Sequence, residues 1–278
     1  MQSADRIRTE PVALTIAGSD SSGGAGIQAD HKTFAALRVY GASVLTALTA
    51  QNTTGVQDVH AVPAAFVGKQ LESVLSDLDV RAIKTGMLAT AEIIEVVAAT
   101  LRARSDIAGV VDPVMVATSG DPLIAADAIR VVRDQLVPTA TLITPNLNEA
   151  AVLLDGPVAQ DAAEMEGQAA ALLDLGCRGV LLKGGHAMHR TDACDFYATA
   201  KEQAWICGER IATPNTHGTG CTLSSAIAAF LVRGESEREA IGSAKTYLTQ
   251  ALRSGAEQIV GAGAGPVDHL FAIRQQRA

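Results

Sequence analysis

The stretch "VALTIAGSDSSGGAGIQADHKTFAALR" (12–38) decides the fold. Residues 12–18 form a continuous apolar run that stops at a glycine, which is typical of a strand buried on both faces of a parallel sheet. Residues 18–26 are rich in glycine and serine, and residues 26–38 carry apolar side chains at helical spacing. A strand, a glycine-rich connection and a helix in this order predict one unit of an α/β fold.

The same alternation continues along the chain. The apolar patterns predict strands at 43–50, 81–86, 109–113, 141–146 and 179–185, and helices at 63–78, 90–103, 127–138, within 147–175, at 219–233 and at 236–253. A hairpin with its turn at 200–203 is predicted over 192–211. This order favours an α/β fold with a mostly parallel central sheet and helices on both faces. Because no composition shift marks a linker, we expect a disordered tail at 1–11 and a single domain over 12–278.

The composition excludes several classes of function. The 278 residues carry a formal net charge of −8, which argues against nonspecific nucleic-acid binding because that needs a basic face. No apolar run is long enough for a membrane span or a signal peptide. The four cysteines form no C-x-x-C pair, so we expect neither a disulfide framework nor a zinc site. We therefore expect a cytoplasmic protein in a reducing compartment, without a nucleic-acid or membrane partner.

Polar residues gather where the predicted strands end. Ligands of parallel α/β sheets bind at the carboxyl ends of the strands. At those ends this chain carries Asp20, Gln51, Asn146, Glu149 and Lys183. The glycine-rich segment 18–26 matches neither the P-loop nor the dinucleotide fingerprint, so it is either an ordinary turn or a loop that lets a ligand approach the backbone.

Asp30 raises a sharper question. At helical spacing it shares a face with Phe34 and Leu37, and a carboxylate on an apolar stripe costs free energy unless a partner binds it. One interpretation is a capping bond near the helix start. The other is an acceptor for N–H or O–H groups of a substrate.

The segment "TPNLNE" (144–149) places Asn146 and Glu149 three residues apart where a strand gives way to a helix. Oxygen ligands of this kind suit hydrated Mg²⁺, and the same spacing suits a helix-capping box, so both interpretations remain open. Lys183, at the end of another strand, would neutralise phosphate charge or simply be solvated.

The stretch "NTHGTGCTLSSAIAAFL" (215–231) begins a helix apolar enough to be buried. The first N–H groups of such a helix have no partner within it, and an anion satisfies them. Gly218 and Gly220 would let that anion approach closely, and Cys221 lies where the local field favours a thiolate. A buried structural cysteine after a tight turn is the alternative.

Taken together, these segments resemble a known family. The motifs "AGSDSSGGAGIQADHKTF", "TALTAQNTTGV", "KTGML", "DPVM…SGDPL", "TPNLNEA", "KGGH" and "NTHGTGCTLSSAIAA" are similar to those of hydroxymethylpyrimidine/phosphomethylpyrimidine kinase, over about residues 12–268. The resemblance implies a ribokinase-like three-layer αβα sandwich. It also implies two ATP-dependent phosphorylations, first of 4-amino-5-hydroxymethyl-2-methylpyrimidine and then of its monophosphate, for thiamine biosynthesis. His31 departs from the family motif, which usually has leucine there.

The resemblance also implies roles for individual residues. The pyrimidine would contact Asp30 and Gln51, with Gly18, Ala25, Met87 and Val114 nearby. The ATP side would comprise Lys183, Asn146, Glu149 and Asp112, with Glu149 toward Mg²⁺. Gly218, Thr219 and Gly220 would form an anion hole, and Cys221 would be the base that most ribokinase relatives supply as aspartate. ATP and Mg²⁺ are the implied cofactors, and a homodimer is the implied assembly.

Two rival functions remain. Pyridoxal kinase shares the fold and the cysteine motif, and its substrate is also a ring with a hydroxymethyl arm, so this activity or a dual one is possible. A non-catalytic pyrimidine or nucleotide sensor is the rival of another class, although a sensor would not need the cysteine, the lysine and the Asn–Glu pair together. Residues 114–122 and 186–192 are candidates for a loop that closes over the substrate.

Overall fold

The computed structural model describes residues 10–115, 126–184 and 192–275. At its centre lies a nine-stranded sheet in the order β3-β2-β1-β4-β5-β6-β7-β8-β9. The strands are β1 (Val12–Asp20), β2 (Tyr40–Asn52), β3 (Gly55–Ala61), β4 (Val80–Thr85), β5 (Ala108–Val111), β6 (Leu142–Ile143), β7 (Gly179–Lys183), β8 (Asp192–Thr199) and β9 (Gln203–Glu209). Pairing is parallel from β2 to β7, and β3, β8 and β9 join antiparallel at the two edges.

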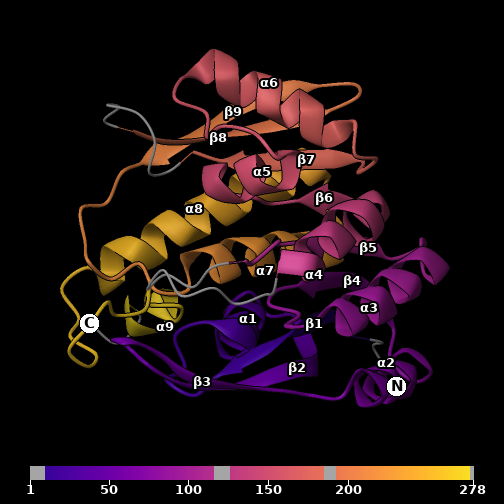
Figure 1. Ribbon diagram of the computed structural model, residues 1–278. Helices are drawn as coiled ribbons and strands as arrows, with labels where there is room; N and C mark the ends of the chain where they lie inside the picture. The colour runs from indigo at the N-terminus through magenta and orange to yellow at the C-terminus, as the bar shows by residue number, and fades with distance from the viewer. Residues whose placement is uncertain (1–9, 116–125, 185–191, 276–278) are drawn as a thin grey trace, which may run out of the picture.

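Helices cover both faces of this sheet (Figure 1). Residues of α2 (Ala64–Leu75), α3 (Ala91–Ala103), α4 (Ala126–Val131), α5 (Leu147–Leu154) and α6 (Ala162–Leu173) pack into one core. Residues of α1 (Gly26–Ala36), α7 (Thr219–Val232), α8 (Glu237–Gly255) and α9 (Phe271–Gln275) pack into a second core on the other face. The predicted three-layer αβα sandwich with a mostly parallel sheet is confirmed.

The parallel strands bring their carboxyl ends to one edge of the sheet. Parallel pairing from β2 to β7 explains this arrangement, and the apolar runs of β1 and β7 fit strands that helices cover on both faces. The first of these runs, β1, is almost entirely buried between β2 and β4. The polar residues that follow the strands are therefore grouped at this edge.

Two elements differ from the prediction. Edge strand β3 was missed, because its sequence GVQDVHA has exposed residues in succession and no alternation of apolar and polar side chains. The single helix predicted over 127–138 is divided into α4, a π-helical segment at Val132–Leu136 and a 3₁₀ turn at Val137–Thr139. Pro138 explains the final turn, because a proline ring and its missing N–H end an α-helix.

The cysteines also require a correction. Cys194 of β8 and Cys207 of β9 are joined by a disulfide, whereas the sequence predicted none. The predicted hairpin does form, and its register places the two cysteines directly opposite each other, which cysteine spacing alone does not reveal. Cys177 and Cys221 are free. Within the described residues, no helix combines the length and the apolar character needed to cross a membrane.

Candidate active site

A cavity of about 960 Å³ opens where the parallel strands end. It is lined by all but one of the residues predicted from the sequence: Gly18, Ala25, Gln51, Met87, Asp112, Val114, Asn146, Glu149, Lys183, Gly218, Thr219, Gly220 and Cys221. They come from segments spread over most of the chain, and the parallel topology brings them together. The two candidate closing loops lie mainly outside the described residues, at 116–125 and 185–191.

Asp30 is the exception, and its predicted contact with the substrate is corrected. Its side chain is 0% exposed. Each of its carboxylate oxygens lies 2.9 Å from Nζ of Lys84 on β4. Thr15 and Ser225 donate further hydrogen bonds to it. The capping interpretation is also wrong, because Ala25 caps α1 without a side-chain bond. The buried lysine of β4 is the partner that the apolar helix face requires.

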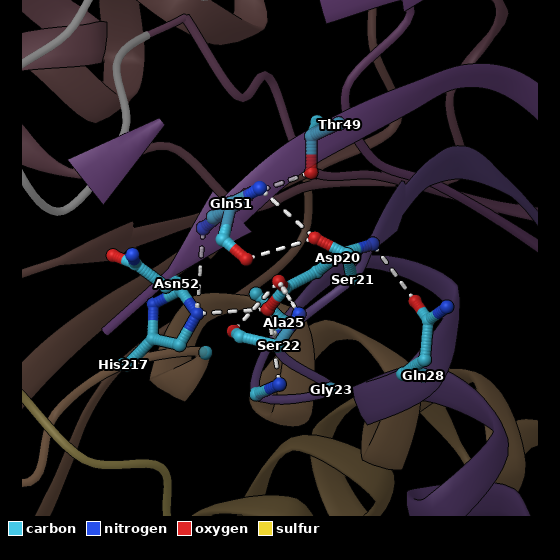
Figure 2. A network of polar contacts seen from close by, with 12 residues as sticks. Asp20, Ser21, Ser22, Gly23, Ala25, Gln28, Thr49, Gln51, Asn52 and His217 are labelled. Carbon is cyan, nitrogen blue, oxygen red and sulfur yellow. Dashed lines mark hydrogen bonds and ion pairs between the residues drawn. The ribbon is translucent and has the colours of Figure 1, made fainter. Parts of the chain in front are cut away.

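Asp20 organises the glycine-rich loop between β1 and α1. Its carboxylate accepts hydrogen bonds from the backbone N–H groups of Ser22, Gly24 and Ala25 at 2.8–2.9 Å, and it lies 2.9 Å from Nε2 of His217. Burial raises the pKa of Asp20, but the hydrogen bonds from His217, Ser22 and Ala25 lower it well below its usual range. Asp20 is thus an ionised anchor between the first loop and the segment before α7 (Figure 2).

Gln51 lies beside this anchor. Its backbone N–H donates to Oγ of Ser21 at 2.9 Å, its Oε1 accepts from Thr49 at 3.1 Å, and its Nε2 lies 3.5 Å from Nε2 of His217 (Figure 2). Gly18 lies nearby in the cavity wall, where an added Cβ would lie 2.6 Å from the methyl carbon of Met87. This end of the cavity therefore offers amide and backbone groups next to apolar side chains, which suits a small polar ring.

The start of α7 forms another part of the wall. Gly218 is the N-cap residue at φ 78°, and no side chain caps this helix. An added Cβ at Gly218 would lie 2.0 Å from the carbonyl oxygen of Gly24, so contact between the two loops requires a glycine here. Within the described structure, the N–H groups of Gly220 and Cys221 have no hydrogen-bond acceptor. They remain available to an anion in the cavity.

Cys221 is a free thiol. Burial raises its pKa to about 11, and the negative charges of Asp30 and Asp112 act in the same direction, while Lys84 lowers it. Burial thus opposes the thiolate that the helix start was expected to favour, and it outweighs the positive charge of Lys84.

The charged side chains opposite α7 form a small network. Nζ of Lys183 lies 2.9 Å from Oδ1 of Asp112 and 4.0 Å from Oε2 of Glu149. Burial raises the pKa of Asp112, but Lys183 and Lys84 lower it below its usual value, so this carboxylate stays ionised. Burial raises the pKa of Glu149 to about 7. Lys183 therefore contacts one carboxylate that stays ionised, that of Asp112, and lies near a second, that of Glu149, which titrates near neutral pH.

Asn146 and Glu149 form a capping box at the start of α5. Oδ1 of Asn146 accepts from the Glu149 N–H at 2.9 Å, and Oε2 of Glu149 accepts from the Asn146 N–H at 2.7 Å. The capping interpretation of this pair is confirmed. Glu149 also lines the cavity, and the backbone N–H of Met115 is a further donor to its carboxylate.

The opposite end of the cavity was missed by sequence reasoning. It is lined by residues of the connection after β9 and of α8: Glu209, Arg210, Ile211, Ala212, Thr213, Lys245, Leu248, Thr249 and Leu252. Lys245 is held by Asp195 at 2.6 Å. Nε and Nη2 of Arg210 are buried and have no acceptor in the described structure. No motif marks these residues, and the signal that was available is the lone basic residue directly after the hairpin.

The fold and the cavity define a class of protein, a small-molecule phosphotransferase with the ribokinase-like fold. A family model described as phosphomethylpyrimidine kinase matches residues 20–268, and the chain belongs to this family. It is 50% identical over 260 residues to the hydroxymethylpyrimidine/phosphomethylpyrimidine kinase of Salmonella typhimurium, a match that covers 94% of this chain and 97% of that protein.

Two further comparisons extend this finding. The chain is 48% identical over 276 residues to the chloroplastic thiamine biosynthetic bifunctional enzyme of Arabidopsis thaliana, which covers 99% of this chain but 53% of that longer protein. The solved ADP complex of Bacillus subtilis pyridoxal kinase superposes with a TM-score of 0.87 at 37% identity, covering 95% of this chain and 99% of that one.

Proposed function

We infer that this chain transfers phosphoryl groups from ATP to 4-amino-5-hydroxymethyl-2-methylpyrimidine and then to its monophosphate, giving the pyrophosphate used in thiamine biosynthesis. The observation that carries this inference is the 50% identity along 97% of the Salmonella typhimurium enzyme, together with the single cavity that the matching motifs line. ATP consumption measured with the pyrimidine alcohol, its monophosphate and pyridoxal tests it. Turnover with pyridoxal alone would contradict it.

The ring would lie at the end of the cavity lined by Gln51. The amide of Gln51 offers both a donor and an acceptor to an aminopyrimidine edge, and Met87 and Val114 offer apolar contact to the ring. Gly18 and Ala25 would let the ring lie against the backbone. The hydroxymethyl arm would then point toward the start of α7.

The nucleotide would occupy the rest of the cavity. Its terminal phosphate would accept from the free N–H groups of Gly220 and Cys221, where the helix dipole favours negative charge, and Lys183 would neutralise it from the opposite side. The connection after β9 and the apolar face of α8 would hold the nucleoside. Arg210 would donate its two unpartnered N–H groups to oxygens of this nucleotide.

The donors near Glu149 fit Mg²⁺. This ion keeps several waters and usually takes one or two carboxylates together with substrate phosphates, so a cage of three acidic residues is not needed. Glu149 is a carboxylate at the cavity wall, and burial raises its pKa although Lys183 acts in the opposite direction, so a cation beside it would favour its ionised form. When bound, the ion would screen the negative charge of the phosphates.

Cys221 would accept the proton of the substrate hydroxyl. The new bond forms between the hydroxymethyl oxygen and the γ-phosphorus, the bond from that phosphorus to the β-phosphate oxygen breaks, ADP leaves, and the proton moves to the sulfur. Phosphoryl transfer depends mainly on positioning and charge neutralisation, so the N–H groups and Lys183 carry most of the effect. Only the thiolate can accept this proton, so the Cys221 thiol first gives its own proton to solvent, and its raised pKa makes the thiolate the minor form near neutral pH.

A pyridoxal kinase activity is the second candidate, because the superposition on the Bacillus subtilis pyridoxal kinase covers nearly the whole chain. The identity to that enzyme is 37%, against 50% to the Salmonella typhimurium pyrimidine kinase, which is why the pyrimidine is preferred. A single cytoplasmic domain over 12–278 and a homodimer remain proposals, and sedimentation analysis of the purified chain tests the dimer.

A further inference from the structure

A buried ion pair lies beneath the cavity floor, outside the roles described above. Lys84 and Asp30 are both 0% exposed, and each carboxylate oxygen lies 2.9 Å from Nζ of Lys84. Burying two charges costs free energy that their attraction often fails to offset, and apolar residues of similar volume frequently replace such pairs without loss of stability. Stability alone therefore gives a weak reason for this pair.

The surroundings of the pair connect it to the site. Asp30 accepts from Ser225, which lies one helical turn beyond Cys221 on the same face of α7. Nζ of Lys84 lies beneath Gly86 in the cavity wall, where an added Cβ would be 3.1 Å from it. Gly86, which has no side chain, thus lies next to this buried ammonium group and also lines the cavity.

Charged groups from the elements packed against the start of α7 surround Cys221. Those that act on its sulfur are Asp30 of α1, Lys84 of β4, Asp112 after β5 and Lys183 of β7. Asp20 of β1, bound by His217, and Lys245 of α8, bound by Asp195, line the same cavity. Among these charges, Lys84 has the largest effect on the thiol and lowers its pKa, whereas Asp30 and Asp112 raise it. The lysine and its own partner thus act on the sulfur in opposite directions.

We propose that Lys84 is a positioning residue for Cys221: its buried ammonium group, held in place by Asp30, is the charge that stabilises the sulfur as an anion. This gives the buried pair a function that a pair of apolar residues could not perform. The catalytic meaning rests on the proposed role of Cys221 as proton acceptor, but the electrostatic coupling does not.

The test is the rate at which iodoacetamide alkylates Cys221, followed by peptide mass spectrometry as the pH is raised, in a Cys177→Ala background. Only the thiolate reacts. Lys84→Met removes the positive charge that lowers the pKa of Cys221, so we expect alkylation at about pH 9 to slow by about tenfold or more, because the loss of a nearby opposite charge moves a pKa by ~1–3. Asp30→Asn removes the negative charge, and we expect no slowing.

Ser225→Ala is the matched control, because it breaks the link between the pair and α7 without changing any charge. We expect it to leave the alkylation profile unchanged. Equal slowing in Ser225→Ala and Lys84→Met, slowing in Asp30→Asn, or no slowing in Lys84→Met would each overturn the proposal. If Lys84→Met fails to fold, Lys84→Gln keeps a donor toward Asp30 and tests the same charge.

Kinetics of the same variants separate this inference from the proposed function. A shifted alkylation profile with unchanged turnover in both phosphorylation steps would support the coupling and remove Cys221 from the role of proton acceptor. An unshifted profile would reject the coupling whatever the turnover.

Discussion

Replacing Gly218 by alanine tests how the start of α7 is built. At φ 78° an alanine costs about 1–2 kcal/mol, because its Cβ crowds the backbone in the left-handed region. The added Cβ would also lie 2.0 Å from the Gly24 carbonyl oxygen, and relief of such an overlap costs about 1–3 kcal/mol more. We therefore expect the free energy of unfolding to fall by about 2–5 kcal/mol.

Gly234 provides the matched control. It too has a positive φ, of 91°, but an added Cβ there would meet nothing within 4 Å. Gly234→Ala should therefore lose about 1–2 kcal/mol and keep its activity. In Gly218→Ala, we expect the loops that hold Gly24 and Gly218 to separate by about 1 Å. The N–H groups at the start of α7 then move away from the terminal phosphate of the nucleotide, and such a displacement costs roughly 10²-fold in rate.

We test this by measuring urea unfolding and kcat/KM for the pyrimidine alcohol on both variants. Equal destabilisation of Gly218→Ala and Gly234→Ala, together with normal kcat/KM in both, would refute the reasoning that contact with Gly24 fixes the helix start.

Three further predictions concern single side chains. Cys221→Ala should lower the rate of the first phosphorylation by about 10²–10⁴-fold and spare the second, whose phosphate nucleophile needs no strong base; equal losses in both steps would contradict the role as base. The pKa of Glu149 in the folded chain is raised to about 7, above its ordinary value in the unfolded chain. Between these two values the folded chain binds one more proton than the unfolded chain. The stability that this proton contributes is therefore present at low pH and is lost as the pH rises toward neutrality. Urea unfolding from pH 5 to 8, in the absence of divalent cations, should show this loss in the wild type and a flatter profile in Glu149→Gln; parallel profiles would count against it. Arg210→Gln should raise the KM for ATP by about tenfold, the loss expected for a charge-assisted hydrogen bond, and leave the KM for the pyrimidine unchanged; an unchanged KM for ATP would exclude the contact.

The sequence predicted the order of strands and helices well because the buried strands are long apolar runs. It failed at β3, an exposed edge strand without alternation, and at the disulfide, which depends on the register of the hairpin between Cys194 and Cys207. Periodicity identifies which face of an element is apolar, but it does not report which residue of a neighbouring element lies opposite.

The same limit explains the errors in the site. Asp30 of helix α1 was correctly singled out as a carboxylate that needs a partner, but its partner, Lys84, lies 54 residues away on strand β4. The expectation of a thiolate at Cys221 did not include desolvation, which raises the pKa of the thiol. Desolvation depends on burial, and the helix start does not reveal burial by itself. Arg210 was missed because a single basic residue in a connection has no pattern.

The contact between Asp20 and His217 links the site to the order in which the chain is made. These residues are 197 positions apart, and their hydrogen bond closes the first loop against the helix near the other end of the chain. Most of the parallel strands precede His217 in the sequence. A growing polypeptide can therefore assemble them before His217 is available to bind Asp20. Contacts of such long range form late. We therefore expect prematurely terminated chains to be inert rather than partly active, and the recovery of activity after dilution from denaturant to report completion of the entire fold.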